Sequence, residues 1–280
     1  VILPAPYWVS YSEIVKIAGG IPVEIPTPIE NDFKLTPAQL ERAITAKTRM
    51  VIYSSPCNPT GTVYLKEELE ALAEVLRKYP DILIISDEIY ELINFSGKHA
   101  SMAAIPDMYE RTITVNGVSK GFAMTGWRLG YIGAPKWIAD ACTKIQGQFT
   151  SAASSISQMA TKAAVEADPA VTHEMKAAFL KRRDLVLDEL RSIPGLGLNV
   201  PEGAFYIFPD VSAYFGKSFN GQVIHTASDL CNFILEQEYV ALVTGEAFGD
   251  PNCIRISYAA SEKELLEAVS RIKRALAKLN

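Results

Sequence analysis

Three short segments of the chain place chemically useful side chains directly after apolar runs. Asn58 follows the run M-V-I-Y-S within the turn S-P-C-N-P-T-G, and Asp87 follows the run I-L-I-I-S. Lys120 follows T-I-T-V-N within the loop G-V-S-K. Taken alone, each has an ordinary explanation as a turn former, a helix cap or a solvated lysine. If the three runs are neighbouring parallel strands, the three side chains meet at one edge of a sheet, where ligands bind.

A lysine, a carboxylate, an asparagine and a tyrosine at one place suit chemistry on an aldehyde cofactor. The amine of Lys120 can condense with an aldehyde. In pyridoxal phosphate (PLP), the aldehyde is attached to a pyridine ring that withdraws electrons from the α-carbon of a bound amino acid. A carboxylate such as Asp87 keeps the ring nitrogen protonated, and Asn58 and Tyr90 can hydrogen-bond the phenolate oxygen of the ring. These residues therefore favour amino-acid chemistry with PLP.

Alternating strand-like and helix-like segments are expected to position these side chains. The predicted strands are Met50–Ser54, Ile82–Ser86 and Thr112–Asn116, and the predicted helices run from Thr36 to about Ala46 and from Lys66 to Tyr79. The first helix is indicated by a capping box, T-P-A-Q, with proline at the first helical position. Strand, helix and strand in this rhythm predict an α/β fold with a mostly parallel sheet sandwiched by helices.

The second half of the chain has a different pattern, which predicts a second domain. A long helix is expected from Val171 to Ile193, where proline and glycine follow. Shorter strands are expected over Ala204–Phe208 and Cys253–Tyr258, and a last helix from Ser261 to about Lys278. We expect a large domain over residues 1–168 and a smaller C-terminal α+β domain over residues 169–280.

Composition and cysteine usage exclude several classes of protein. The formal net charge of -5 gives no reason to expect nucleic acid or an anionic membrane as a partner. No apolar run is long enough to cross a bilayer. The four cysteines and three histidines form no metal-binding spacing, so we expect reduced thiols, no metal and a cytoplasmic protein. The chain begins inside the apolar run V-I-L-P-A-P-Y-W, so we expect upstream sequence to be missing.

The segment S-K-G-F-A-M-T-G-W-R-L-G-Y at residues 119–131 resembles the cofactor-lysine signature of class I aminotransferases, the fold type I PLP enzymes. The segments N-P-T-G at 58–61, D-E-I-Y at 87–90 and I-R-I-S at 254–257 match further landmarks of that family in the same order. The resemblance covers essentially the whole chain. The nearest subgroup resembles bacterial and plastid aspartate aminotransferases, some of which also transaminate prephenate. The resemblance implies the PLP-dependent transferase fold.

The resemblance also implies roles around the cofactor ring. Lys120 matches the lysine that binds the cofactor covalently and moves a proton between the substrate α-carbon and the cofactor. Asp87 matches the carboxylate on the pyridine nitrogen, and Tyr90 and Asn58 match the groups on the phenolate oxygen. Trp8, in P-Y-W-V-S-Y, matches the aromatic residue that stacks on the ring.

Further matches concern the phosphate, the substrate and the subunit arrangement. Ser119 and Arg128 match phosphate ligands, and the planar guanidinium of arginine suits that group. Arg255 matches the arginine that holds the substrate α-carboxylate by two hydrogen bonds, and Asn58 is also assigned to substrate binding. Full-length relatives carry upstream residues that this chain lacks, and they form homodimers with sites at the interface. We therefore expect a homodimer.

The predicted activity is transfer of an amino group between an amino acid, aspartate or glutamate, and a 2-oxo acid by a ping-pong mechanism. Three alternatives remain open. The first is a prephenate or aromatic aminotransferase, whose residues in this chain would be the same. The second is a PLP-dependent lyase of the same fold. The third is a non-enzymatic regulator that retains a PLP-binding domain.

Overall fold

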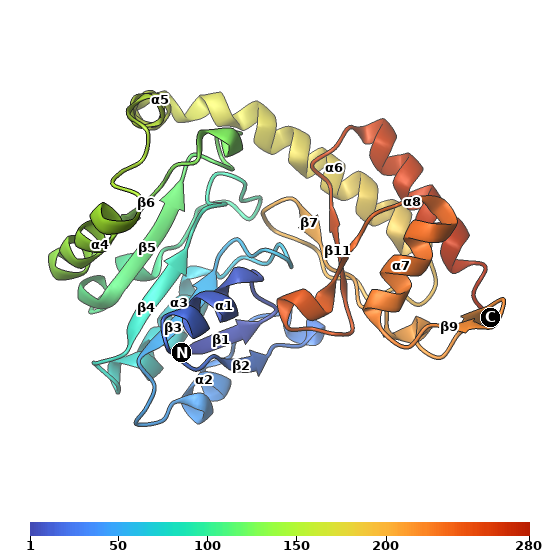
Figure 1. Cartoon of the computed structure of the whole chain (residues 1–280), viewed down its shortest axis with the longest axis horizontal. Helices are drawn as coiled ribbons and strands as arrows, with labels where there is room; N and C mark the ends of the chain where they lie inside the picture. The colour runs from blue at the N-terminus through green and yellow to red at the C-terminus, as the bar shows by residue number, and fades with distance from the viewer.

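A six-stranded sheet forms the centre of the first half of the chain (Figure 1), and the computed structural model describes all residues 1–280. Its strands are β1 (Ile2–Ala5), β2 (Val23–Pro26), β3 (Met50–Ser54), β4 (Leu83–Asp87), β5 (Thr112–Gly117) and β6 (Gly130–Gly133). Their order across the sheet is β2-β1-β3-β4-β5-β6. All pairs are parallel except β5 with β6, which is antiparallel. The predicted mostly parallel α/β fold is confirmed.

Helices α1 (Ser10–Ile17), α2 (Pro37–Ala43) and α3 (Lys66–Arg77) pack against this sheet. Helices α4 (Lys136–Phe149) and α5 (Ser155–Glu166) follow β6 in the chain. Helix α3 shows why such segments fold onto a sheet, because Leu69, Leu72 and Leu76 lie on one face at spacings of three and four residues. All three are buried in a core cluster that also includes Val51 and Ile84 of the strands.

The first predicted helix, which corresponds to α2, was placed too long at its C-terminal end. The capping box of Thr36 and Gln39 is present, with each side chain bonded to the backbone of the other residue. The helix ends at Ala43, however, and not near Ala46, because Ile44 has extended backbone angles. The hydroxyl of Thr48 then accepts a hydrogen bond from the backbone N–H of Thr45. This local side-chain bond competes with continuation of the helix.

The C-terminal part begins with a long helix and then folds around a small sheet. Its elements are α6 (His173–Arg191), β7 (Tyr206–Ile207), β8 (Ser218–Phe219), β9 (Gln222–Val223), α7 (Ala227–Glu238), β10 (Val243–Thr244), β11 (Ile254–Ser257) and α8 (Glu262–Leu276). Strands β10, β11 and β7 form an antiparallel sheet in that order. Helix α6 extends from the end nearest α5 to the side of α7 and α8 (Figure 1). The predicted long helix, both short strands and the last helix are present with ends a few residues shorter.

Short 3-10 helices connect several of these elements. They are η1 (Ile29–Asn31), η2 (Met102–Ala104), η3 (Tyr109–Arg111), η4 (Thr125–Trp127), η5 (Pro169–Thr172), η6 (Ser212–Tyr214) and η7 (Gly245–Phe248). None of the helices combines the length and the apolar composition that crossing a bilayer requires.

The molecule has two large apolar cores, one in each half of the chain. One has 17 buried residues and packs α2 and α3 against the sheet. The other has 27 buried residues and is built mainly from α6, α7, α8 and the small sheet. Tyr90 and Ile93, which follow β4, belong to the second core. The loop after β4 is thus held by both halves of the chain. The division into domains at residue 168 stays a prediction.

Candidate active site

One cavity of about 510 Å³ lies at the carboxyl ends of the parallel strands. It receives side chains that follow β1, β3, β4 and β5, and it is closed on another side by β7 and β11. All eight side chains singled out from the sequence line it: Trp8, Asn58, Asp87, Tyr90, Ser119, Lys120, Arg128 and Arg255. The structure therefore brings the whole predicted set together, across as much as 247 positions of sequence.

Asp87 is the last residue of β4, where it is half-buried at the cavity wall. The hydroxyl of Tyr11 donates to its Oδ2 at 2.6 Å, and the backbone N–H of Ile89 donates to its Oδ1 at 3.1 Å. Burial raises the pKa of Asp87, and these two hydrogen bonds lower it in part. No cationic side chain forms a salt bridge with this carboxylate. A buried anion that lacks a cation is unfavourable, so the site is suited to a positively charged ligand atom.

Lys120 lies in the turn after β5, with its ammonium over two aromatic rings. The distances from Nζ to the ring centroids are 5.8 Å for Tyr90 and 5.7 Å for Phe205. Burial lowers the pKa of Lys120, and the charges of Arg255 and Arg128 lower it further. A lysine with a lowered pKa has a larger neutral fraction at neutral pH, which is the form that acts as a nucleophile or a base.

Arg255 projects from β11 between two aromatic rings. Its guanidinium carbon lies 4.7 Å from the ring centroid of Tyr206 and 4.8 Å from that of Phe248. One terminal nitrogen, Nη1, donates to Oδ1 of Asn58 at 2.9 Å. The Nε atom is buried and has no hydrogen-bond partner. A planar cation with open donors at the wall of a cavity is suited to a carboxylate.

Arg128 and Ser119 lie at the other end of the cavity. Arg128 is exposed and has left-handed backbone angles, with φ of 51°. Its Nη1 donates to the backbone oxygen of Thr125 at 2.9 Å. A non-glycine residue held in this region of backbone space carries strain, which is common at functional sites. An exposed cation and a hydroxyl can together bind an anion such as a phosphate group.

Two aromatic side chains complete the walls. Trp8 is 39% exposed, so much of its ring is open to a ligand, and its edge lies against Tyr11 at a centroid distance of 5.6 Å. Tyr90 is buried, and its hydroxyl lies 2.9 Å from that of Tyr206. Burial raises the pKa of Tyr90 well above its ordinary value, as do the charge and hydrogen bond of Tyr206. Tyr90 is therefore neutral and offers a hydroxyl group.

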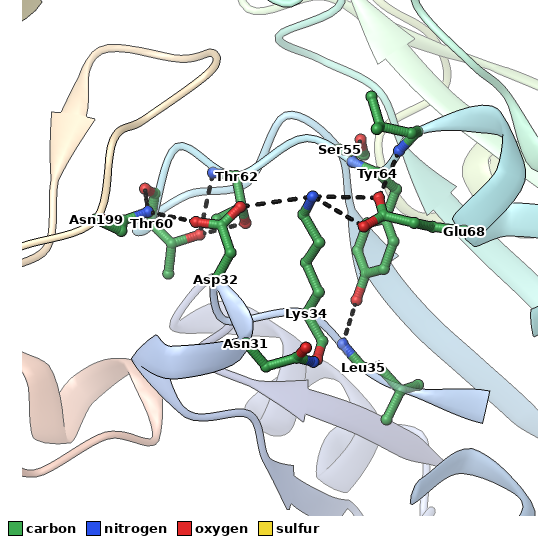
Figure 2. Close-up of polar contacts among 11 residues, drawn as sticks. Asn31, Asp32, Lys34, Leu35, Ser55, Thr60, Thr62, Tyr64, Glu68 and Asn199 are labelled. Atoms are coloured by element: carbon green, nitrogen blue, oxygen red, sulfur yellow. Dashed lines mark hydrogen bonds and ion pairs between the residues drawn. The ribbon is translucent and has the colours of Figure 1, made fainter. Parts of the chain in front are cut away.

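Asn199 connects the turn that carries Asn58 to the loop after β2 by hydrogen bonds (Figure 2). The amide nitrogen of Asn199 donates to Oδ1 of Asp32 at 3.0 Å and to the backbone oxygen of Thr60 at 3.4 Å. Lys34 lies between two carboxylates, at 3.5 Å from Asp32 and 3.1 Å from Glu68. These contacts link the β2 loop, the Asn58 turn and the C-terminal part of the chain.

Gly61 allows the C-terminal part to approach this turn closely. Its φ of +70° is left-handed, and a Cβ atom at this position would overlap Pro201. Its backbone oxygen accepts hydrogen bonds from the N–H groups of Glu202 and Gly203, both at 2.8 Å. The glycine in N-P-T-G is therefore required by backbone conformation and by packing.

The sequence did not indicate Tyr11 or Tyr206 as site residues. Tyr11 comes three residues after Trp8, and one helical turn of α1 brings its hydroxyl to Asp87. That spacing could have been used to find it. Tyr206 lies on a strand of only two residues, and its relation to Tyr90 depends on the packing of the two halves of the chain. No local pattern indicates it.

A cluster of Glu88, Glu91 and His99 lies beside the cavity, outside its lining. Potential ligand atoms of the three residues lie within 4.8 Å of one another. His99 Nε2 and Glu88 Oε2 are 2.7 Å apart, and Asn116 donates to Glu91 at 2.8 Å. Hydrogen bonds account for this arrangement, and the expectation that the protein holds no metal stays a prediction.

The geometry can now be compared with known proteins. The profile of the family "Aminotransferase class I and II" matches residues 1–272. A bifunctional aspartate aminotransferase and glutamate/aspartate-prephenate aminotransferase of Petunia hybrida is 50% identical over 99% of this chain. An aspartate/prephenate aminotransferase of Nitrosomonas europaea is 49% identical over 97% of it. The chain belongs to the class I and II aminotransferase family.

Solved structures agree in fold. An aspartate aminotransferase from Rhizobium meliloti has a TM-score of 0.96 and 44% identity, and the match covers 100% of this chain and 70% of that one. An aspartate aminotransferase from Thermus thermophilus with maleate has a TM-score of 0.89 and 40% identity, with coverage of 98% and 69%. The present chain spans 59% of the length of the Petunia relative and 70% of the Nitrosomonas relative.

Proposed function

We propose that this chain contains the cofactor and substrate-carboxylate sites of a PLP-dependent aminotransferase. One observation carries the proposal. A lysine with a lowered pKa, a half-buried carboxylate without a cation and an arginine with open donors face the same cavity. Membership of the class I and II aminotransferase family supports the same conclusion, because its members generally depend on PLP.

The residues present fit PLP. Asp87 offers the negative charge that a protonated pyridine nitrogen requires. The buried hydroxyl of Ser54 lines the cavity and has no partner in the protein, so the polar lining is not saturated by protein contacts. When bound, PLP supplies an aldehyde for amine attachment and an electron-withdrawing ring that makes the substrate α-proton acidic.

The other side chains would hold the remaining parts of the cofactor. Tyr90 and Asn58 would hydrogen-bond the phenolate oxygen, and the exposed face of Trp8 would stack on the ring. Ser119 and Arg128 would bind the phosphate. These assignments rest on the family resemblance of the motifs and are supported by the common cavity.

The chain's own residues then carry out binding and proton transfer. Arg255 binds the substrate α-carboxylate, and Asn58 fixes the guanidinium on one side through the bond to Nη1. A substrate held in this way would present its α-carbon to the cavity that Lys120 also lines. Lys120 accepts the proton from the α-carbon when its amine is neutral. Rate acceleration comes from the fixed positions of these groups and from general base catalysis.

For the whole enzyme, the proposed reaction moves an amino group from aspartate or glutamate to a 2-oxo acid in a ping-pong sequence. Prephenate is a second candidate acceptor, favoured because the Petunia and Nitrosomonas relatives carry it in their names. We also propose a cytoplasmic homodimer with no nucleic-acid partner, and a large domain over residues 1–168 with a small domain over residues 169–280.

The test is an absorbance spectrum of the purified chain with PLP, before and after addition of aspartate, beside Lys120→Ala. A near-visible band that is absent in Lys120→Ala and that is lost with aspartate as oxaloacetate appears would support transamination. In a parallel assay, prephenate is added after aspartate as the acceptor of the amino group. A wild-type spectrum identical to that of Lys120→Ala would contradict the proposal.

A further inference from the structure

Tyr206 contacts both Tyr90 and Arg255 in the cavity. It is 6% exposed, lies on β7 and lines the cavity, whereas its neighbour Ile207 points into the core. Strand β7 pairs with β11, the strand that carries Arg255. One short strand therefore sets the position of a tyrosine between the residue proposed to bind the carboxylate and the residue proposed to bind the cofactor phenolate.

The hydroxyl groups of Tyr90 and Tyr206 share one hydrogen bond at 2.9 Å. Each hydroxyl has a single proton, so one group donates and the other accepts. Burial raises the pKa of both groups. Both groups therefore carry their proton. An anionic ligand oxygen has no proton to give, so Tyr90 must donate its single proton to that oxygen when the two meet. The shared hydrogen bond must then be donated by Tyr206.

Donation by Tyr206 has a direct consequence for Tyr90. If the Tyr90 oxygen accepts the shared bond, its own proton is free to point into the cavity. A hydroxyl that accepts one hydrogen bond also becomes a stronger donor, because bonds in a chain polarise one another. Tyr90 would then donate to an anionic oxygen of the ligand.

The ring of Tyr206 has a separate contact. Its centroid lies 4.7 Å from the guanidinium carbon of Arg255, and Phe248 lies on Arg255 at 4.8 Å. Two aromatic faces hold the guanidinium plane in place and favour its positive charge. Asn58 fixes one terminal nitrogen, so the remaining donors keep a constant direction.

We propose that Tyr206 is a positioning residue that directs the Tyr90 proton toward the cofactor with its hydroxyl and supports Arg255 with its ring. This inference rests on the proposed function, because it assigns the phenolate of PLP to Tyr90 and a carboxylate to Arg255. It couples the two halves of the site through one side chain. Removing the hydroxyl and removing the ring should therefore have different effects.

The hydroxyl is tested by the pH midpoint of the absorbance of PLP bound to Lys120. A hydrogen bond to the phenolate stabilises the state that has lost the proton from the nitrogen linking Lys120 to PLP. Tyr90→Phe should raise the midpoint by about one pH unit. Tyr206→Phe should raise it by about half as much, because it only weakens the Tyr90 bond. The double variant should match Tyr90→Phe alone, since Tyr206 acts through Tyr90.

Tyr214→Phe is the matched control. Tyr214 is a buried tyrosine of the C-terminal part whose hydroxyl donates to the backbone of Pro194, and it does not line the cavity. Its substitution removes a buried hydroxyl without moving the midpoint. An unchanged midpoint in Tyr206→Phe, or a shift that adds fully to that of Tyr90→Phe, would overturn the role of the hydroxyl.

The ring is tested by calorimetric titration of the PLP-bound chain with succinate. Tyr206→Phe keeps the ring and should bind succinate within about twofold of wild type, whereas Tyr206→Leu should bind about fivefold more weakly. Equal affinity of the Leu and Phe variants would overturn the role of the ring. If the wild-type chain shows no Lys120-dependent band, both the proposed function and the hydroxyl role fail. If the band forms and Tyr206→Phe leaves it unchanged, only the present inference fails.

Discussion

The two ends of the cavity are built in different ways. At the end with Asp87 and Arg255, the polar groups are fixed by hydrogen bonds and lie against buried aromatic rings. At the end with Arg128, the chain continues into β6, whose four residues are all exposed. Helix α4, which follows, has no buried residue, and Phe149 at its end is 84% exposed.

The difference indicates which part of the ligand this chain recognises by itself. In the proposed binding mode, the ring and carboxylate of a ligand would meet side chains whose directions are already set by packing. The phosphate would meet an exposed arginine whose only hydrogen bond is to a neighbouring backbone oxygen. Fixed groups lose less entropy on binding, so we expect the first end to contribute more affinity.

Arg255→Ala should have the largest effect at the well-ordered end. The variant removes the guanidinium that lies against the rings of Tyr206 and Phe248, so succinate binding to the PLP-bound chain should fall on the order of 1000-fold, about 4 kcal/mol. Calorimetry measures the affinity. The succinate affinity of Arg255→Lys should lie between those of the wild type and Arg255→Ala, because lysine keeps the charge without the planar donors. Retention of succinate affinity within threefold would contradict the assignment of Arg255.

Leu69→Ala should destabilise the chain by about 3 kcal/mol, because Leu69 lies on the fully buried face of α3 and truncation leaves a cavity. The variant for comparison is Phe149→Ser on the exposed helix α4, which should alter the free energy of unfolding by less than about 0.5 kcal/mol. Urea unfolding followed by circular dichroism measures both. Similar losses for the two variants would show that α4 is buried in solution.

Arg128→Ala should weaken PLP binding by only about tenfold, because an exposed cation gains less from an anion than a buried one. Fluorescence titration with PLP gives the affinity, and titration with pyridoxal, which lacks the phosphate, is the control. The variant and the wild type should bind pyridoxal equally. A loss of pyridoxal affinity would mean that Arg128 acts on the fold and not on the phosphate.

Asp87→Asn should stabilise the cofactor-free chain slightly at pH 7. Burial raises the folded-state pKa of Asp87, so the folded chain holds the proton more tightly than the unfolded chain does. The free energy of unfolding therefore falls as the pH rises from the ordinary carboxyl pKa through the raised one. The variant should be more stable than the wild type at pH 7 and equally stable near pH 3. Thermal unfolding at both pH values decides, and an equal difference at both would exclude ionisation as the cause.

The residues that end the parallel strands could be predicted from sequence because their positions follow from local patterns. Asn58, Asp87 and Lys120 each come after an apolar run, and the parallel order of β3, β4 and β5 brings them together. The family resemblance added Trp8 and Arg255, which no run-and-turn pattern would have placed in the same cavity.

The rest depended on contacts between distant parts of the chain. Tyr206 reaches Tyr90 only because the loop after β4 packs into the core of the C-terminal part. The exposure of α4 was also not predicted, since its apolar residues would suit a buried face equally well. Helix ends were uncertain by a few residues because bonds such as that between Thr45 and Thr48 compete with the helix.

The hydrogen bond between Asn58 and Arg255 spans 197 positions of sequence. The ribosome adds residues one at a time from the amino end, and domains generally fold as they emerge. Every side chain proposed to contact PLP has been synthesised by residue 128, whereas Arg255 follows more than a hundred residues later. Tyr90, however, lies in the apolar core that α6, α7 and α8 complete, and the backbone of Gly61 in the Asn58 turn is bonded to Glu202 and Gly203. The cofactor side chains therefore reach their final positions only after the C-terminal part has been synthesised, so both binding sites are completed together, late in translation.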